Sequence, residues 1–412
     1  MEKRDVVIIG GGPAGLAAAV ELKKKGIEDI LIIEREKQPG GILRQCIHDG
    51  FGLTRFGETL SGPEYAQRFI DQAAQYHVEM ICNATVIDLS SDRVVTYDSR
   101  EGLVQIQAKA VILTMGCRER TRGALAIPGT RPSGIYNAGV AQSYMNLFNT
   151  MVGREILIMG SGDIGLIMAR RFTLEGAHVK GVFEVLPYPS GLPRNIEQCL
   201  NDYNIPLYLS HSVVDIKGEE RIEGVTVVQV DENMKPVPGT EKEFSCDTLV
   251  LSVGLIPENE LSIAAGVELD GRTKGAFVDE NYQTSTEGIF AAGNVLHVHD
   301  LVDFVSLEAE ALADGVVRYL NGEAQKDCEI EVVPDRNIGH VIPQRVSGKR
   351  DFQVSMRVRR PMGRCRITLR QGENTVVSKV VPKAIPAEMI QFKVPSDKIN
   401  SGEKIEVLVN EQ

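Results

Sequence analysis

The chain has 412 residues, of which 43% are apolar and 25% are charged, and its formal net charge at pH 7 is −11. These values are ordinary for a globular protein of two or three domains, and the acidic balance argues against nucleic acid or an anionic membrane as a partner of the whole chain. No apolar run approaches the length of a membrane span, and the seven cysteines show no Cys-x-x-Cys spacing. We therefore expect a cytoplasmic protein without a zinc site or disulfide framework.

The first motif lies at the N-terminus, where an apolar run at residues 6–9 precedes a glycine-rich turn. The glycines have G-x-G-x-x-G spacing and are Gly10, Gly12 and Gly15. Residues 16–25 then read as a helix, and the apolar run at residues 30–33 ends at Glu34, nineteen residues after Gly15. Such a turn brings backbone N–H groups to a pyrophosphate, and the acidic residue binds ribose hydroxyls. The pattern predicts a dinucleotide site.

The next part of the chain predicts two helices and a series of strands. Helices are expected at residues 63–76, where apolar side chains recur on one face, and at residues 137–150. Strands are expected at residues 78–82, 85–89, 93–97, 104–107 and 110–114. The last of these reads as a buried parallel strand that breaks into a loop at Gly116.

A second copy of the opening pattern follows. An apolar strand at residues 155–159 leads into three glycines with the same spacing, Gly160, Gly162 and Gly165. Residues 163–174 read as a helix, and the strand at residues 178–183 ends at Glu184, again nineteen residues after the third glycine. Because two matches share one internal spacing, the sequence predicts two dinucleotide sites.

The rest of the chain is richer in strands. Residues 207–246 are strand-rich, buried strands are expected at residues 248–253 and 288–292, and a long helix is expected at residues 301–320. After Asn321 and Gly322 the helical signals stop, and alternating strands broken by Pro and Gly predict a small all-β, sandwich-like domain at residues 330–412.

Three segments coincide in this order: GGGPAG with Glu34, GSGDIG with Glu184, and TSTEGIFAAGN at residues 284–294. Together they resemble the two-dinucleotide-binding-domain flavoproteins, the pyridine nucleotide–disulfide oxidoreductase superfamily. The resemblance implies an α/β fold of two Rossmann-like, three-layer ββα domains. An FAD-binding domain would comprise residues 1–117 and 256–325. An NAD(P)H-binding domain, residues 118–255 with its linkers, would be inserted in it.

The resemblance also implies the residues that bind each cofactor. Those expected at FAD are Gly10, Gly12, Pro13, Ala14, Gly15, Glu34, Arg35, Gly41, Val86, Thr114, Gly116, Gly293 and Asn294. Those expected at NAD(P)H are Gly160, Gly162, Asp163, Ile164, Gly165, Glu184 and Gly254. Asn294 stands where the family usually has Asp. Glu184 suits the ribose hydroxyls of NADH and would repel the extra phosphate of NADPH, so we expect NAD(H) to be preferred over NADP(H).

The catalytic disulfide of the disulfide reductases is missing from its usual place. The positions two and seven residues after Gly40 and Gly41 hold Leu43 and His48, which predicts an enzyme without a redox-active disulfide. Cys46 resembles the sulfenate-forming cysteine of NADH oxidases and peroxidases, and His48 could lower its pKa. Alternatively, Cys46 is a packed side chain and His48 a hydrogen-bonded loop residue. Cys46 and His48 are nevertheless the candidate catalytic residues.

Two stretches, GGILRQCIHDGFGL and AAGNVLHVHDLVDFVS, resemble a narrower group. These are the flavoproteins that accompany an FAD-dependent glycerol-3-phosphate dehydrogenase, and the α-subunits of opine oxidases and hydrogen cyanide synthase. The likeness implies an FAD-dependent oxidoreductase that passes electrons between NADH and a second flavoprotein subunit or a small acceptor, as an oligomer or hetero-complex. The alternatives are a stand-alone NADH oxidase or peroxidase, and a non-catalytic FAD-bound assembly subunit.

Two polar clusters remain. His297, His299 and Asp300 could ligate a metal, but without a third well-spaced ligand a loop near the flavin is the favoured interpretation, and we expect no metal. A hairpin turning at residues 361–363 is predicted to carry on one face Arg357, Arg359, Arg364, Arg366 and Arg370. That face is either solvated or docks onto an acidic partner or the acidic domains of this chain.

Overall fold

A computed structural model describes residues 1–323, 327–400 and 402–412 of the chain. The chain divides into two compact units, and the second is a continuous segment placed between two segments of the first. Unit 1 comprises Met1–Cys117 and Pro257–Gln412, and unit 2 comprises Arg118–Ile256. Among the described residues, no helix combines the length and apolar character needed to cross a membrane.

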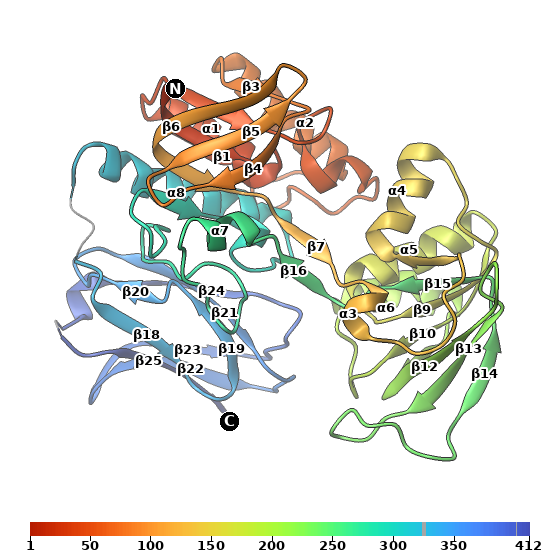
Figure 1. Cartoon of the computed structure of the whole chain (residues 1–412). Coiled ribbons are helices and arrows are strands. Elements are labelled where there is room, and N and C mark those ends of the chain that lie inside the picture. The colour runs from red at the N-terminus through yellow and green to blue at the C-terminus, as the bar shows by residue number, and fades with distance from the viewer. Residues whose placement is uncertain (324–326, 401) are drawn as a thin grey trace. The chain divides into compact units, whose positions relative to one another are not determined.

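Unit 1 is built on a mixed sheet (Figure 1). Its strands lie in the order β3 (Glu79–Ile81), β2 (Ile30–Ile33), β1 (Glu2–Ile9), β6 (Gly102–Leu113), β5 (Val94–Ser99) and β4 (Thr85–Leu89), and β17 (Ile289–Ala291) also pairs with β6. The pairs among β3, β2, β1, β6 and β17 are parallel, whereas β5 is antiparallel to both β6 and β4.

The strands predicted at residues 104–107 and 110–114 are one continuous strand, β6. Its first half pairs with β5, its second half pairs with β17, and β1 pairs along most of its length. Along one edge of β6 the neighbouring strand changes from the antiparallel β5 to the parallel β17, and the two halves of β6 have different burial patterns. The alternating half and the apolar half therefore read as separate strands in the sequence.

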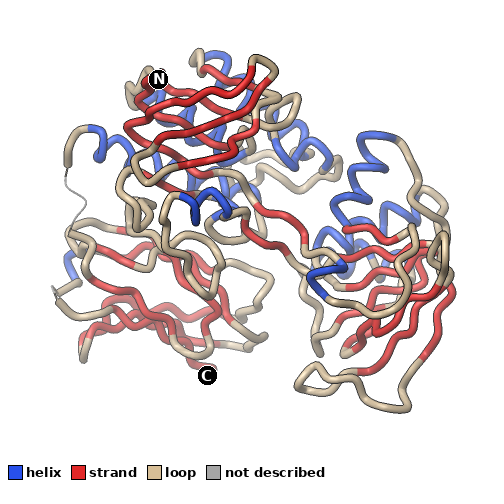
Figure 2. The backbone as a smooth tube through the Cα atoms, in the orientation of Figure 1, coloured by secondary structure: helices blue, strands red, loops and turns tan. Residues whose placement is uncertain are grey.

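The alternation of side chains along the strands gives this sheet two buried faces. On one face, Val6 and Ile8 pack with the helices α1 (Pro13–Lys24), α2 (Gly62–Gln75) and α8 (Val302–Leu320). On the other face, Val7 and Ile9 pack with residues of β4 and β5 and of the segment 265–278, which follows α7 (Glu260–Ala264). Figure 2 shows the helices and strands of these layers in separate colours.

Unit 2 repeats this plan with a parallel sheet and an antiparallel layer. The parallel sheet has the order β11 (Leu207–Leu209), β10 (His178–Glu184), β9 (Glu155–Met159), β15 (Thr248–Leu251) and β8 (Ile135–Asn137). The antiparallel layer has the order β12 (His211–Lys217), β13 (Gly224–Gln229) and β14 (Lys242–Ser245). The helices are α3 (Arg122–Leu125), α4 (Ala138–Phe148), α5 (Asp163–Leu174), α6 (Pro193–Cys199) and the 3₁₀ helix η2 (Asn201–Tyr203). The strands β7 (Cys117–Glu119) and β16 (Leu255–Pro257) pair where the chain passes between the units.

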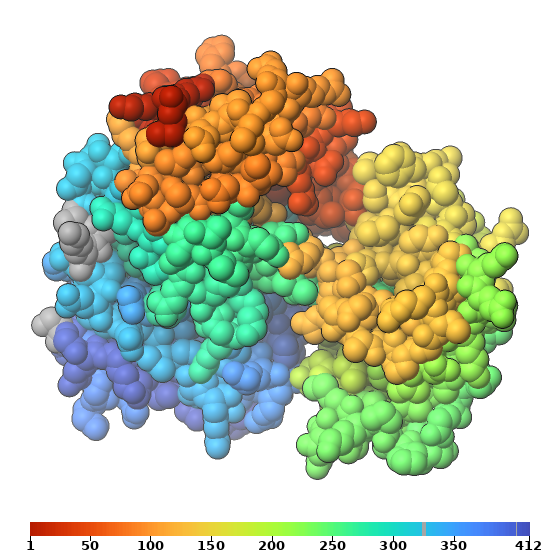
Figure 3. Space-filling view, viewed as in Figure 1, coloured from red at the N-terminus to blue at the C-terminus, as the bar shows by residue number. Residues whose placement is uncertain are grey.

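The C-terminal part of unit 1 consists of two sheets around a single apolar core. One sheet has the order β20 (Arg345–Val346), β18 (Ile330–Pro334), β25 (Ile405–Glu411), β22 (Cys365–Gln371) and β23 (Asn374–Val381). The other has the order β19 (Ile338–Ile342), β21 (Phe352–Val358) and β24 (Ile390–Val394), and the 3₁₀ helix η4 (Ser396–Lys398) follows β24. In Figure 3 the segment after β16, in green, lies between the orange N-terminal region and the blue C-terminal strands.

The predicted α/β class with additional β sheets is confirmed.

The hairpin predicted around residues 361–363 is wrong, because β21 and β22 belong to different sheets. Their apolar faces, including Val354 and Ile367, do meet in the core between the sheets, as the alternation requires. The arginines are consequently split. Arg366 and Arg370 are exposed on β22, whereas Arg357 on β21 reaches the loop before α8 and pairs with Asp300 at 3.0 Å.

Candidate functional site

The first glycine turn joins β1 to α1. Gly10 has a φ of +107°, and a Cβ there would lie 2.6 Å from Thr114 O, while a Cβ at Gly15 would lie 1.9 Å from Gly10 O. At Gly12, the residue that caps α1, the nearest atom to an added Cβ is Gly41 Cα at 3.9 Å. Gly10 and Gly15 are thus required by the protein's own packing, and Gly12 leaves the helix N-terminus open to an approaching group.

Glu34 follows β2 directly, beneath this turn, and is buried. Its Oε2 accepts the backbone N–H of Gly11 at 2.6 Å, and its Oε1 accepts that of Glu36 at 2.8 Å. These bonds hold the carboxylate against the turn. Because each oxygen keeps a second lone pair, the carboxylate can still accept the hydroxyls of a ribose.

Other predicted residues surround the same turn. The Thr114 hydroxyl donates to Ile9 O at 2.9 Å and Gly10 O at 3.0 Å, and a Cβ at Gly41, in the 3₁₀ helix η1 (Gly41–Gln45), would lie 3.1 Å from Gly12 Cα. A Cβ at Gly293, in the 3₁₀ helix η3 (Gly293–Val295), would lie 3.0 Å from Ala14 Cβ. Segments from four parts of the chain therefore converge on the N-terminus of α1.

The remaining predicted residues of this set lie further out. Pro13 begins α1, Gly116 has a φ of +74° after β6, and Val86 is half-buried in β4. Arg35 is exposed. The amide oxygen of Asn294 accepts the backbone N–H of His299 at 3.0 Å, which fixes the loop that follows η3.

The second glycine turn joins β9 to α5 in the same way. A Cβ at Gly160 would lie 2.1 Å from Ser252 O, and one at Gly165 would lie 2.6 Å from Ser252 Cβ. The Ser252 hydroxyl accepts the backbone N–H of Gly165 at 3.0 Å, whereas Gly162 caps α5. Ser252 therefore lies against this turn where Thr114 lies against the first, but its hydroxyl accepts a backbone N–H whereas that of Thr114 donates to backbone oxygens.

Glu184 ends β10 and is buried among donors. Its Oε2 accepts the backbone N–H of Ser161 at 3.0 Å and the hydroxyls of Ser161 and Ser190, and its Oε1 accepts Leu186 N–H at 3.0 Å. The carboxylate is therefore fixed against the second turn, with a lone pair left on Oε1.

The other predicted residues of unit 2 lie around this turn. Asp163 begins α5 and accepts Leu192 N–H at 2.8 Å, which ties the loop after β10 to α5. Ile164 packs against the helix-side core of the unit. Gly254 has a φ of +99° and accepts Arg120 N–H at 3.0 Å.

Comparison with known proteins gives the family of this doubled arrangement. The sequence model described as pyridine nucleotide-disulphide oxidoreductase matches residues 4–312, which is most of the chain. The chain belongs to that family. Family members are flavoprotein oxidoreductases that use FAD and a pyridine nucleotide.

The similar proteins are distant. Hydrogen cyanide synthase subunit HcnB of Pseudomonas aeruginosa is 25% identical over 309 residues, which are 71% of this chain and 64% of that protein. An opine oxidase subunit of Agrobacterium tumefaciens is 26% identical over 313 residues, which are 70% of this chain and 61% of that protein. The chain thus spans less than two thirds of these relatives. The crystal structure of T. acidophilum thioredoxin reductase shares the fold, with a TM-score of 0.64 and 23% identity over 79% of this chain and all of that one.

The first turn fits the pyrophosphate and ribose of FAD, because Gly12 leaves space in front of the helix N-terminus and Glu34 lies beneath it. The second turn fits a pyridine nucleotide by the same plan, because Gly162 caps α5 and Glu184 is buried beneath the turn, although a Cβ at Gly162 would also meet Ser252 Oγ at 3.2 Å. Both fits rest on the positions of glycines and buried carboxylates, and each unit has its own glycine turn and its own buried glutamate.

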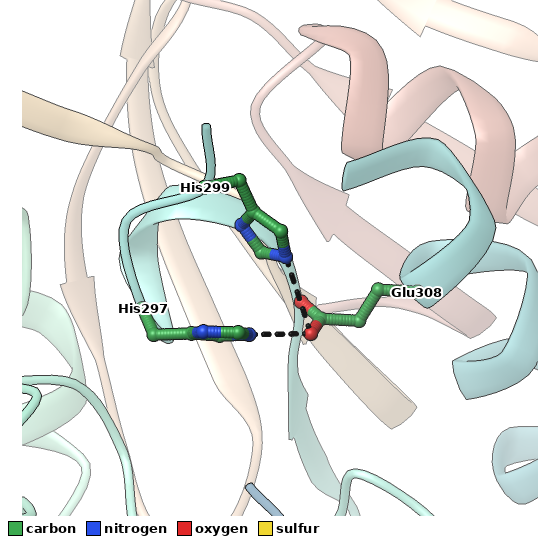
Figure 4. Close-up of side chains that lie close together, drawn as sticks. All are labelled: His297, His299 and Glu308. Atoms are coloured by element: carbon green, nitrogen blue, oxygen red, sulfur yellow. Dashed lines mark hydrogen bonds and ion pairs between the residues drawn. The ribbon is translucent and has the colours of Figure 1, made fainter. Parts of the chain in front are cut away.

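Glu308 of α8 forms a buried cluster with two histidines of the preceding loop (Figure 4). His297 Nε2 lies 2.6 Å from Glu308 Oε2, and His299 Nε2 lies 3.4 Å from the same oxygen. Glu308 Oε1 accepts the backbone N–H of Gly293 at 2.7 Å. Burial would raise the pKa of Glu308, but the two imidazoles outweigh it and hold that pKa below its usual range. The predicted third member of the cluster, Asp300, points instead to Arg357.

Cys46 and His48 lie at the end of η1 and in the loop after it. The Cys46 thiol donates to Ile42 O at 3.3 Å, and burial raises its pKa to about 12. Such a thiol is protonated at neutral pH. His48 Nδ1 lies 3.0 Å from Asp49 O, and its ring packs against Phe51. All seven cysteines lie in the described residues, and none of them forms a disulfide.

We expect Cys46→Ser to leave the rate of flavin reduction by NADH within about twofold of wild type, because a protonated thiol is a poor nucleophile. Stopped-flow reduction and steady-state turnover with peroxide would measure this. Cys328→Ser serves as the matched control, because burial also raises the pKa of that thiol. A selective loss of peroxide turnover in Cys46→Ser would restore the redox-cysteine interpretation.

Sequence reasoning missed Ser252, Glu308 and Asp303. Ser252 was detectable, because LTMG at residues 113–116 and LSVG at residues 251–254 end equivalent strands. Asp303 is buried in the first turn of α8 and accepts the backbone N–H groups of Gly52, Thr54 and Arg55. No local pattern indicates that contact, because its partners lie some 250 residues away in sequence.

Proposed function

We propose that the chain passes electrons between NADH and a partner flavoprotein or small acceptor by way of bound FAD. The observation that carries this proposal is the repeated cradle, in which a glycine turn at a helix N-terminus is closed by a buried glutamate at the next strand end. Glu34 and Glu184 occupy these places in units 1 and 2. Two such cradles in one chain suit one enzyme that binds two dinucleotides.

FAD supplies the redox chemistry, since its ring system takes up the two electrons and proton equivalent of a hydride. The residues of this chain bind the two dinucleotides and orient them. Glu34 is held by two backbone N–H groups, so its oxygens are already directed when a ribose arrives. Thr114 and Ser252 fix the shapes of the two turns, which avoids reorganisation on binding.

NADH is the proposed nucleotide. Glu184 is buried and bonded by two serines, so it remains in place when a nucleotide binds. A 2′-phosphate beside it would set like charges together. Arg170 of α5 donates to the Tyr203 hydroxyl of η2 at 3.3 Å, and Arg171 forms an ion pair with Glu175, so both side chains already have partners.

A second protein is part of the proposal. HcnB and the opine oxidase relative are both subunits of larger enzymes by their names, and each extends beyond the part that this chain matches. We propose that this chain likewise hands its electrons to a second protein of the glycerol-3-phosphate, amine or opine dehydrogenase type. The absence of disulfide or zinc spacing among the seven cysteines supports a cytoplasmic location for this transfer.

Anaerobic titration of the purified holoprotein tests the function. We expect stoichiometric NADH to bleach the flavin, and NADPH to do so at least about tenfold more slowly, since like-charge contact is disfavoured by more than a kcal/mol. Absorbance of the flavin gives both rates. A flavin that NADH leaves oxidised would overturn the proposal in favour of a non-catalytic assembly role. Full peroxide turnover by the isolated chain would favour the stand-alone oxidase or peroxidase.

A further inference from the structure

The cluster at the start of α8 has the chemistry of a metal site. We propose that His297, His299 and Glu308 bind a divalent transition-metal ion of the zinc class. The three ligand atoms lie within 4.8 Å of one another, and the side chains converge in Figure 4. The inference goes beyond the proposed function, because neither electron transfer nor dinucleotide binding requires a metal here. It also departs from the sequence-based expectation of no metal, since the third ligand comes from the helix.

The spacing of the donor atoms suits a metal. Ligands about 2.0–2.1 Å from a tetrahedral zinc lie roughly 3.3 Å from one another. His299 Nε2 and Glu308 Oε2 are already 3.4 Å apart. His297 Nε2 is 2.6 Å from Glu308 Oε2, a hydrogen-bond distance. That pair must open by less than an ångström when the proton between them is replaced by the ion.

The protonation of His299 leaves a lone pair directed at the carboxylate. Asn294 Oδ1 accepts the backbone N–H of His299 at 3.0 Å, which identifies that atom as the amide oxygen. His299 Nδ1 lies 3.3 Å from this oxygen and must therefore be the donor, so in the neutral ring Nε2 carries no proton. Nε2 is buried and lies 3.4 Å from Glu308 Oε2. In the neutral ring, two acceptors therefore face each other there, and either a proton on Nε2 or a metal ion between the two atoms satisfies both.

The surroundings support the ligands as in known metal sites. Glu308 Oε1 is held by Gly293 N–H, and His299 Nδ1 by Asn294, so a hydrogen bond orients each of these two ligands from behind. The nearby Arg357 pairs with Asp300, which offsets part of its repulsion of an ion. Two imidazoles and one carboxylate select a borderline first-row ion over Mg²⁺ or Ca²⁺, which prefer all-oxygen sites. His340, whose ring centroid lies 5.5 Å from that of His297, flanks the site.

The test is metal binding by the full holoprotein. Protein equilibrated with Zn²⁺ and freed of excess should contain about one zinc per chain by mass spectrometry. His299→Asn and Glu308→Gln should each bind zinc at least about tenfold more weakly. Gln keeps an oxygen for Gly293 N–H, and Asn keeps a donor for Asn294. His178→Asn, at an exposed histidine paired with Glu155, is the matched control and should bind zinc like wild type.

A second measurement on wild type keeps the proposal falsifiable if a variant fails to fold. X-ray absorption of the zinc-loaded protein should show only nitrogen and oxygen ligands, with imidazole scattering, at about 2.0–2.1 Å. Absence of bound zinc in wild type, sulfur ligands at about 2.3 Å, or unchanged affinity in the folded variants would each overturn the proposal. Flavin reduction by NADH, followed in the same samples, reports on the proposed function separately.

Discussion

Replacing Gly12 with alanine should yield a folded chain that binds FAD about ten- to a hundred-fold more weakly than wild type. Gly12 has a φ of −78°, which alanine adopts freely, and its added Cβ would meet no protein atom closer than 3.9 Å. The methyl group would instead occupy the space in front of the α1 N-terminus, where a pyrophosphate must approach backbone N–H groups. The loss therefore falls on the ligand and not on folding.

Flavin content after dialysis and FAD titration of the apoprotein measure the effect, with circular dichroism as the check on folding. Gly162→Ala is the counterpart variant in unit 2, because Gly162 caps α5 in the equivalent place, but its added Cβ would lie 3.2 Å from Ser252 Oγ, so its folding must be checked separately. That variant should keep its FAD and lose reduction by NADH. If Gly12→Ala binds FAD as tightly as wild type, the first turn is not the FAD cradle.

Replacing Arg357 with methionine should destabilise unit 1 by about 3 kcal/mol. The side chain of Asp300 is only 7% exposed, and Arg357 Nη2 donates to it at 3.0 Å. Arg357 also donates to the backbone oxygens of Val298, Pro386 and Ala387, so its removal leaves a buried carboxylate and several carbonyl groups without their donor. Methionine retains the apolar stem, so the loss reports the charge and the hydrogen bonds.

Thermal and denaturant unfolding measure this loss, and Arg366→Met, at an exposed position of β22, should change stability by less than about 0.5 kcal/mol. Adding Asp300→Asn to Arg357→Met should recover part of the stability, because the uncompensated buried charge is gone. Equal effects of Arg357→Met and Arg366→Met would show that the contact between the C-terminal strands and the loop before α8 contributes nothing.

Many of the helices and strands could be predicted from the sequence because the patterns that specify them are local. The helix predicted at residues 163–174 matches α5, and the strand predicted at residues 155–159 matches β9. The sheets to which β21 and β22 belong could not be predicted, because alternation shows which side chains are buried but not which sheet a strand joins. The redox role of Cys46 is still a prediction, and the pKa of about 12 disfavours it.

The two cradles follow from local sequence signals, because the glycine spacing, the apolar runs and the glutamate nineteen residues on all lie within one strand–turn–helix–strand unit. The pairs of side chains that meet across the chain depend instead on its overall packing. Arg357 finds Asp300 across 57 residues, and Thr114 reaches Gly10 across 104. Glu308 meets His297 only because the loop folds back on α8. Such contacts depend on how whole elements pack, and no periodicity records them.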